Sequence, residues 1–351
     1  MTEHVPAGDQ LPEEQERVGR AQGSVVGSAR GTSVLMQEAA GTTTAELAYD
    51  SGVEVKARSQ WAYARIRFFR HRLAVASLVV LLLLGLVAVF ASRVAPHGYD
   101  ELDFAHIAQG PTLDGGRIFG TDLLGRDYLS RIIFGLRTSL WVAFFVAGLS
   151  TVFGTTLGAV AGYYGGRIDN LLMRFTDLIL TLPGLAVLLV AAAYLGQDDS
   201  KIGPITLSQP VKVGLILAFL FWTGLARIVR GVFLSLREKE FVEAARAAGA
   251  SDRRIIFRHI LPNCVGPIAV TMTLVVALAI LTEAALSFLG FGIQPPHPAL
   301  GSLIADGETN GFDTWWLVTF PGLVIVVVAL CVNFIGDGLR DALDPTQRTR
   351  A

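Results

Sequence analysis

Residues 73–91 read LAVASLVVLLLLGLVAVFA, a run of 19 residues that contains no charged side chain. A helix needs about 20 mainly apolar residues to cross the hydrocarbon core of a bilayer. The whole chain shares this character, because 52% of its 351 residues are hydrophobic and only 17% are charged. Soluble domains carry about 25% charged residues. The sequence therefore predicts a membrane protein and excludes a wholly soluble one.

Five further apolar runs follow this one, and we predict an all-α polytopic protein with six membrane-spanning helices. The fourth run is the weakest, because only 14 uncharged residues separate Lys212 from Arg227. We interpret it as a span whose charged ends snorkel to opposite membrane surfaces, although a re-entrant segment also fits that length. The spans are expected at about residues 73–91, 139–162, 176–196, 212–230, 264–289 and 315–336.

Lysine and arginine residues cluster beside some spans and not beside others. Six lie within residues 56–72, just before the first span, and eight lie within residues 227–258, whereas residues 292–313 contain none. Because cytoplasmic loops carry an excess of Lys and Arg, we expect both chain ends and the 227–258 loop to be cytoplasmic. The long first outer loop, with five arginines, departs from this pattern. We expect a disordered tail at 1–60, a transmembrane domain at 61–345 and a second tail at 346–351.

Motifs for catalysis and cofactor binding are missing from the sequence. None of the four lysines follows a glycine, so the chain has no Walker A loop for ATP, and its six histidines form no H-E-x-x-H zinc pair. The formal net charge of −1 argues against a basic, nucleic-acid-binding surface. We therefore expect no catalytic residue, metal site, bound cofactor or nucleic-acid partner, and a lipid bilayer as the surroundings of the chain.

The basic segment 240–262 has the pattern of two short helices joined by a turn. The first is expected at Glu240–Ala248, ended by Gly249 in a left-handed cap. Ser251 or Asp252 is expected to cap a second helix, which runs over Arg253–Ile260 and stops at Pro262. Small residues, a sharp turn and a basic rim suit insertion into a groove of a partner protein. A solvated loop that is basic only because of membrane orientation is the alternative.

The order of residues in this segment favours the docking interpretation. The run EAARAAG at 243–249, followed by HILP at 259–262, resembles the EAA motif of permease subunits in binding-protein-dependent ABC importers. In that family the motif forms the coupling helix that docks on the ATPase subunit, and most members have an aliphatic residue where this chain has a histidine. The resemblance therefore implies ATPase-coupling roles for Glu243, Ala244, Ala245, Gly249, Arg253, Arg254, His259 and Pro262.

Three other motifs resemble the second permease of the peptide and nickel importers within this family. They are GTDLLGRD at 120–127 with the residues that follow to Leu140, RFTD at 174–177, and EAALSFLGFG at 283–292. The resemblance implies type I ABC importer permease architecture in the plasma (inner) membrane of a bacterium. It also implies four kinds of partner: a homologous permease subunit, two ATPase subunits that use ATP and Mg, an extracytoplasmic substrate-binding protein, and the bilayer.

Several residues are candidates for helix packing or for the pathway itself. Gly154, Gly158 and Gly162 repeat every four residues and are expected to let another helix approach closely. Pro183 and Pro321 are expected to kink their helices, at a pathway or as a tolerated distortion. Glu283 is a candidate outer gate, or else a structural hydrogen-bond partner. The stretch 126–140 is amphipathic, and lies flat on the outer interface or extends the second span.

We therefore predict a permease subunit that forms half of a translocation pathway for peptides and couples to ATPases through residues 240–262. The chain itself is expected not to be an enzyme. Nickel or another small solute is the alternative cargo, because the binding protein sets specificity in the family. An ion-coupled secondary carrier is a further alternative; it predicts transport by this chain alone, and internal inverted repeats, which we do not find, would favour it.

Overall fold

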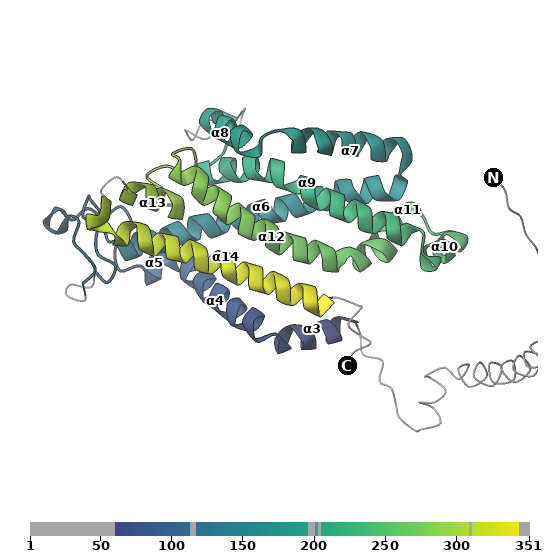
Figure 1. Ribbon diagram of the computed structural model, residues 1–351, viewed down its shortest axis with the longest axis horizontal. Coiled ribbons are helices and arrows are strands. Elements are labelled where there is room, and N and C mark those ends of the chain that lie inside the picture. Colours follow the sequence, from purple (N-terminus) through teal and green to yellow (C-terminus); the bar gives the residue numbers. More distant parts are fainter. Residues whose placement is uncertain (1–59, 113–116, 196–200, 203–204, 309–310, 344–351) are drawn as a thin grey trace, which may run out of the picture. The chain divides into compact units, whose positions relative to one another are not determined.

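The computed structural model describes residues 60–112, 117–195, 201–202, 205–308 and 311–343 (Figure 1). Almost all of the predicted tails therefore lies outside the described residues. The helices are α3 (Gln60–Arg70), α4 (Arg72–Val89), α5 (Ala91–Val94), η1 (Phe104–His106), α6 (Tyr128–Tyr164), α7 (Gly166–Thr181), α8 (Gly184–Leu195), α9 (Gln209–Arg237), α10 (Glu240–Ala247), α11 (Asp252–Arg254), η3 (Ile255–Ile260), α12 (Leu261–Phe288), α13 (Leu300–Glu308), η4 (Gly311–Thr314) and α14 (Trp316–Leu343). Two short strands, β1 (Lys201–Ile202) and β2 (Ile205–Thr206), pair antiparallel.

The predicted set of spans agrees with the lengths and composition of these helices. Five helices in the described residues are long and apolar enough to cross a membrane, and the bent pair α7–α8 brings the number to six. The weak fourth run is one of them, as the central part of α9. The kink expected at Pro183 is confirmed, and it is sharp enough to divide the third span into two helices. The chain bends by 82° between α7 and α8, and Pro183 stands at that break.

Helices α6 and α9 form the centre of the bundle (Figure 1). A Cβ atom added at Gly158 would lie 2.4 Å from the carbonyl oxygen of Ala226, and one at Gly162 would lie 2.6 Å from the Cβ of Phe233. At Gly154 the nearest atom would be the Trp222 carbonyl oxygen, 2.8 Å away. The three glycines therefore lie where the two backbones approach so closely that there is no room for a side chain.

The second span begins earlier than predicted. Helix α6 is 37 residues long and starts at Tyr128, where the Asp127 carboxylate accepts a 2.8 Å hydrogen bond from the Ser130 backbone N–H and caps the helix. Of the two interpretations of 126–140, the extension of the second span is confirmed, because residues 128–140 are the first part of α6, and the interpretation as a helix flat on the interface was wrong. The predicted start at 139 came from taking Arg137 as the boundary of the apolar run. Arg137 is exposed, but the helix continues back past it to Tyr128 and includes Arg131, which is only 4% exposed.

The fifth span also continues through a residue that was predicted to end a helix. From Asp252 to Phe288 the chain stays helical, with η3 forming a π-helical turn just before Pro262. Pro262 occupies the first turn of α12, where a missing N–H is tolerated. The Asn263 side chain donates 2.7 Å to the carbonyl of His259. The prediction of a stop at Pro262 was therefore wrong, because the wider π turn and this side chain accommodate the proline.

Pro321 similarly lies inside a continuous helix, α14. A proline has no N–H to bond the carbonyl four residues earlier, which here belongs to Leu317. That carbonyl instead accepts a 2.5 Å hydrogen bond from the hydroxyl of Tyr128 on α6. A neighbouring helix thus satisfies the group that the proline releases.

The expectation that Lys212 reaches a membrane surface was wrong. Its side chain is fully buried near the start of α9, at 1% exposure, whereas Arg227 is exposed on the same helix. Helix α4, in contrast, is the least enclosed of the candidate spans. Only 17% of it is buried, compared with 56% of an apolar 18-residue stretch in α6 and in α9. Its remaining surface is apolar and suited to lipid.

Candidate functional site

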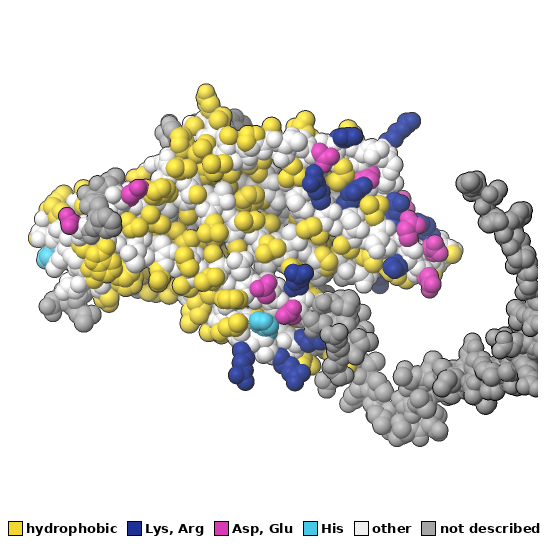
Figure 2. Space-filling view, in the orientation of Figure 1, with side chains coloured by type: hydrophobic (Ala, Val, Ile, Leu, Met, Phe, Trp, Pro, Cys, Tyr) yellow, Lys and Arg dark blue, Asp and Glu magenta, His cyan; other side chains and the backbone are white. Residues whose placement is uncertain are grey.

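The segment 240–262 projects from one end of the bundle, where α9 leads into α10 and α11 leads into α12 (Figure 1). We call residues 240–262 the EAA loop and this end of the molecule the α10 end. Figure 2 shows charged side chains gathered at this end, whereas hydrophobic side chains cover the middle of the molecule. Such a distribution fits a bilayer-spanning body with a water-facing α10 end.

A left-handed glycine ends α10 and sets the direction of the EAA loop. Gly249 has φ +77°, and its N–H donates 2.9 Å to the carbonyl of Arg246. The next N–H, of Ala250, donates 3.0 Å to the carbonyl of Ala245. This pair of bonds is the Schellman arrangement, which favours glycine because an L side chain is strained at positive φ. Ser251 then occupies the N-cap position of α11, without a side-chain hydrogen bond.

The underside of the EAA loop packs into a small hydrophobic core of its own. Val242 from α10 and Ile255 and Ile260 from η3 are fully buried there, beside Phe233 of α9 and Cys264 of α12. Deep burial of three side chains from so short a segment fixes it to the ends of the long helices. The sequence analysis did not identify Val242 as an anchor. The signal that could have identified it is a single branched apolar residue in a helix otherwise rich in alanine.

Polar contacts attach the EAA loop to α6 as well. The hydroxyl of Tyr163 donates 2.7 Å to the carboxylate of Asp252, and the guanidinium of Arg246 lies over the same ring, 5.9 Å from its centroid. Arg237 donates to the carbonyls of Gly162 and Tyr163 at 3.3 and 3.4 Å. These contacts satisfy carbonyls at the end of α6. The EAA loop is therefore tied to α6, α9 and α12 together.

The outer surface of the EAA loop remains open to a partner. Most of the coupling candidates have exposed side chains, namely Glu243, Ala244, Arg253, Arg254 and Pro262. Ala245 and His259 are half-buried. The eighth, Gly249, is also exposed, and a Cβ placed on it would meet no atom within 4 Å. Two aromatic side chains that the sequence reasoning missed, Phe241 and Phe257, are 41% and 67% exposed. Exposed aromatic residues among small ones are typical of anchoring positions in protein interfaces.

Helix α7 is held against α9 near the same end by two ion pairs. Arg230 binds Asp169 through two nitrogen–oxygen contacts of 2.5 and 2.6 Å, and that carboxylate is 8% exposed. Arg227 binds Asp177 at 2.5 Å. The paired guanidinium–carboxylate geometry fixes the orientation of α7 more firmly than a single contact would.

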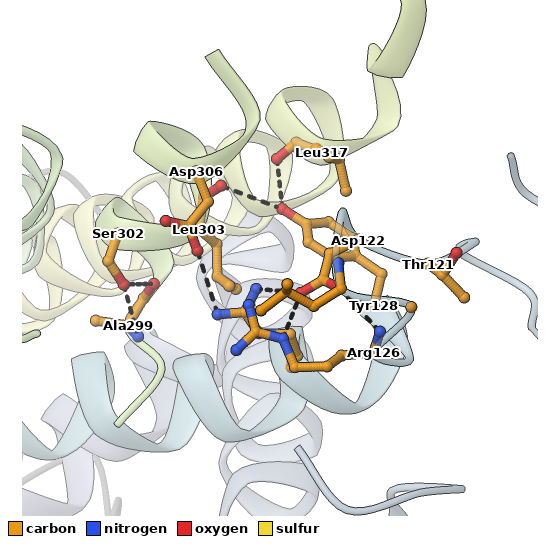
Figure 3. Close-up of polar contacts among 12 residues, drawn as sticks. Thr121, Asp122, Arg126, Tyr128, Ala299, Ser302, Leu303, Asp306 and Leu317 are labelled. Atoms are coloured by element: carbon orange, nitrogen blue, oxygen red, sulfur yellow. Dashed lines mark hydrogen bonds and ion pairs between the residues drawn. The ribbon is translucent and has the colours of Figure 1, made fainter. Parts of the chain in front are cut away.

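The opposite end, which we call the α13 end, is closed by a buried polar cluster (Figure 3). Asp122 is 3% exposed and accepts from the backbone N–H groups of Leu124 and Arg126, both at 2.9 Å. Its other oxygen accepts from the side chains of Arg126 and Arg131, both at 2.6 Å. Arg131 also reaches Asp306 on α13 at 3.2 Å. Asp122 therefore pairs with both arginines.

The three candidates for a gate or pathway occupy separate places in the described part of the chain. Glu283 is fully buried in α12, where one oxygen accepts a 2.7 Å hydrogen bond from Ser287. The Ser287 hydroxyl in turn accepts from the N–H of Ile293 and shapes the turn after α12. Pro183 stands at the α7–α8 break, and Pro321 lies near the start of α14. Among the described residues, no His, Cys, Asp or Glu cluster suits a metal ion.

Two family profiles match the sequence. The profile described as binding-protein-dependent transport system inner membrane component covers residues 154–349, more than half of the chain. The profile described as the N-terminal TM domain of oligopeptide transport permease C covers residues 59–111.

Full-length relatives align along most of the chain. The oligopeptide transport system permease protein OppC of Haemophilus influenzae is 41% identical over 296 residues, covering 84% of this chain and 92% of that protein. The protein of the same description from Escherichia coli is 41% identical over 300 residues, with coverages of 86% and 96%. That from Mycobacterium bovis is 42% identical over 283 residues, with coverages of 81% and 94%. The chain belongs to the family of binding-protein-dependent transport system inner membrane components.

Proposed function

We propose that this chain is the permease subunit of an ATP-driven peptide importer and forms half of its translocation pathway. Peptide is the cargo that we favour because the relatives described above are named as oligopeptide transport permeases. A homologous permease subunit would supply the other half, and a substrate-binding protein would deliver the peptide. Two ATPase subunits would bind ATP and Mg, so the permease itself carries out no chemistry.

In this proposal the α10 end and both chain ends face the cytoplasm of a bacterium, and the α13 end faces outward. The excess of Lys and Arg within residues 227–258 supports this orientation, as do the exposed charges around α10. The EAA loop then meets the ATPase subunit. Phe241 and the alanines of α10 offer a close-fitting apolar surface, and Glu243, Arg253 and Arg254 add charges at its edges.

The proposal rests on one observation: the EAA loop is anchored to the bundle on one side and exposed on the other. Its underside is anchored by Val242, Ile255 and Ile260, whereas Glu243 and Phe241 are exposed. A displacement of the outer face would therefore move the ends of α6, α9 and α12 as one unit, without folding or unfolding the loop. Rigid-body movement of packed helices is a common way to switch between two exposures of a site.

The gate candidates receive different proposals under this mechanism. The α7–α8 break at Pro183 is a place where a span can change direction during the switch, as broken helices do where they line a cavity. Pro321 leaves the Leu317 carbonyl bonded to Tyr128, so it ties α14 to α6 at the α13 end. For Glu283 we propose the structural role, because its bond to Ser287 supports the turn that follows α12.

Replacing Glu243 by glutamine tests the coupling role. Glu243 has no ion pair within the described part of the chain, and its side chain is exposed, so the fold is expected to tolerate the change. Loss of a hydrogen bond to a charged group costs about 1.5–3 kcal/mol. We therefore expect peptide uptake by the reconstituted transporter, and its peptide-stimulated ATP hydrolysis, to fall roughly ten- to a hundredfold.

The matched control is Glu240→Gln, an exposed carboxylate on the same helix that is not a coupling candidate. It should retain uptake and ATP hydrolysis within about a factor of two, as surface substitutions usually do. Both variants should co-purify with the ATPase subunits to the same extent as the unmodified chain. Equal activity of the two variants would remove Glu243 from the coupling surface.

A further inference from the structure

The exposed side of α3 combines apolar side chains with arginines. Tyr63, Ile66 and Phe69 are 42%, 46% and 64% exposed, and Arg65 and Arg70 are exposed on the same side. At 3.6 residues per turn, the three apolar side chains form a strip along the helix, with Arg65 beside one edge and Arg70 within the strip near the other edge. An apolar strip flanked by arginines is the pattern of helices that contact the headgroup boundary of a membrane.

The other side of α3 is fixed to the bundle. Phe68 is half-buried against α14, where a Cβ added to Gly338 would lie 3.3 Å from its ring. The same added atom would lie 2.4 Å from the Cβ of Ala74 in α4, so the three helices meet closely at this glycine. The contact of Phe68 with α14 thus fixes the rotation of α3 so that the apolar strip and its arginines face away from the bundle.

Three arginines near this strip have no acidic partner within the described part of the chain. Arg65, Arg70 and Arg72 make no ion pair there. The carboxylate of Asp341, at the end of α14, lies 3.9 Å from the ring of His71. That histidine also caps α4 by accepting 3.1 Å from the N–H of Ala74. The positive charge of the strip is therefore available to an outside anion.

The position of α3 along the chain places this charge at the edge of the hydrocarbon core. A single residue, His71, separates α3 from α4. Only 17% of α4 is buried, so most of its apolar surface faces lipid. From Arg72 back to Arg65 a helix rises about 10 Å. The headgroup layer on each side of a bilayer is roughly 5–8 Å thick. When α4 spans the core, Arg70 and Arg72 therefore lie at the depth of lipid phosphates, and the long side chain of Arg65 starts at the outer edge of the headgroup layer.

We propose that α3 is a binding surface for anionic phospholipid headgroups. Arg65, Arg70 and Arg72 bind the phosphates, because a guanidinium offers paired donors that match phosphate oxygens. Ile66 and Phe69 reach the adjoining acyl chains. A continuous lipid-facing surface from α4 into α3, together with the matching charge, favours lipid over a protein as the occupant.

Lipid retention by the intact chain tests this proposal. The full-length protein is equilibrated in micelles containing equal amounts of phosphatidylglycerol and phosphatidylcholine, and the lipids that stay bound are counted by native mass spectrometry. The unmodified chain should retain phosphatidylglycerol preferentially. The preference should fall about fivefold for each arginine removed, and hence about 25-fold in the double variant R65Q/R70Q.

The control R137Q/R174Q removes two exposed arginines elsewhere and should change the preference less than twofold. If R65Q/R70Q does not purify as a folded protein, raising the ammonium acetate concentration with the unmodified chain gives the second measurement. Salt screening should then lower its preference. Equal retention of the two lipids by the unmodified chain, as expected if α3 instead meets an acidic protein surface, would contradict the proposal. An equal loss in the control, or a preference insensitive to salt, would do so as well.

Discussion

Replacing Asp122 by asparagine is expected to destabilise the chain by about 3–5 kcal/mol, because the buried guanidinium of Arg131 loses its closer carboxylate and keeps only the 3.2 Å contact with Asp306. Asp122 is 3% exposed and accepts four hydrogen bonds, two of them from arginine side chains. Asparagine keeps the shape of the side chain but loses the negative charge. Thermal unfolding of the purified chain in detergent, followed by loss of the monodisperse species, measures the effect.

Two further variants separate the buried charge from a general effect of mutation at this end. Asp100→Asn changes an exposed carboxylate near the same end and should alter stability by less than about 0.5 kcal/mol. The double variant D122N/R131Q removes both charges and should recover part of the loss, because no unpaired charge is then buried. If D122N unfolds at the same temperature as D100N, the polar cluster does not stabilise the α13 end.

Adding one methyl group at Gly158 is expected to have the other large effect on the fold. The new Cβ of Gly158→Ala would lie 2.4 Å from the carbonyl oxygen of Ala226, and neither backbone can yield without separating α6 from α9. Overpacking of this kind costs about 1–3 kcal/mol. The measurement is the unfolding temperature of the variant, together with its yield as an assembled complex.

Gly148→Ala is a matched control, because Gly148 lies on the same helix and its added Cβ would meet no atom within 4 Å. Alanine favours helix over glycine by roughly 1 kcal/mol, so this variant should be as stable as the unmodified chain or more so. If both variants gained stability, the close approach of α6 and α9 at Gly158 would be wrong.

Composition and apolar runs were enough to predict the all-helical membrane fold, because the bilayer requires each span to be long and uncharged. The same criterion placed the start of the second span at 139 instead of at Tyr128. A run-length criterion stops at Arg137, although the helix continues past that exposed residue and through Arg131, whose charge is neutralised by Asp122 outside the helix. Lys212 is a second example, since its burial depends on how helices from distant parts of the sequence pack.

The EAA loop was located from its residues, and the left-handed turn at Gly249 follows the expected pattern. Its attachment to the bundle was not predicted. Val242 and Tyr163 are unremarkable in the sequence, and only their contacts with α9, η3 and Asp252 show that they fix the loop. The continuation of the helix through Pro262 was also missed, because a π-helical turn has no simple residue pattern.

Photo-crosslinking from α10 in the assembled transporter tests the docking of an ATPase on the EAA loop most directly. A benzophenone amino acid at Ala247, which is exposed on α10, should form a covalent product with an ATPase subunit, identified by its nucleotide-binding sequence. The same probe at Phe104, 68% exposed in η1, should not. An ATPase product from position 104, or only lipid and no ATPase product from position 247, would contradict the account.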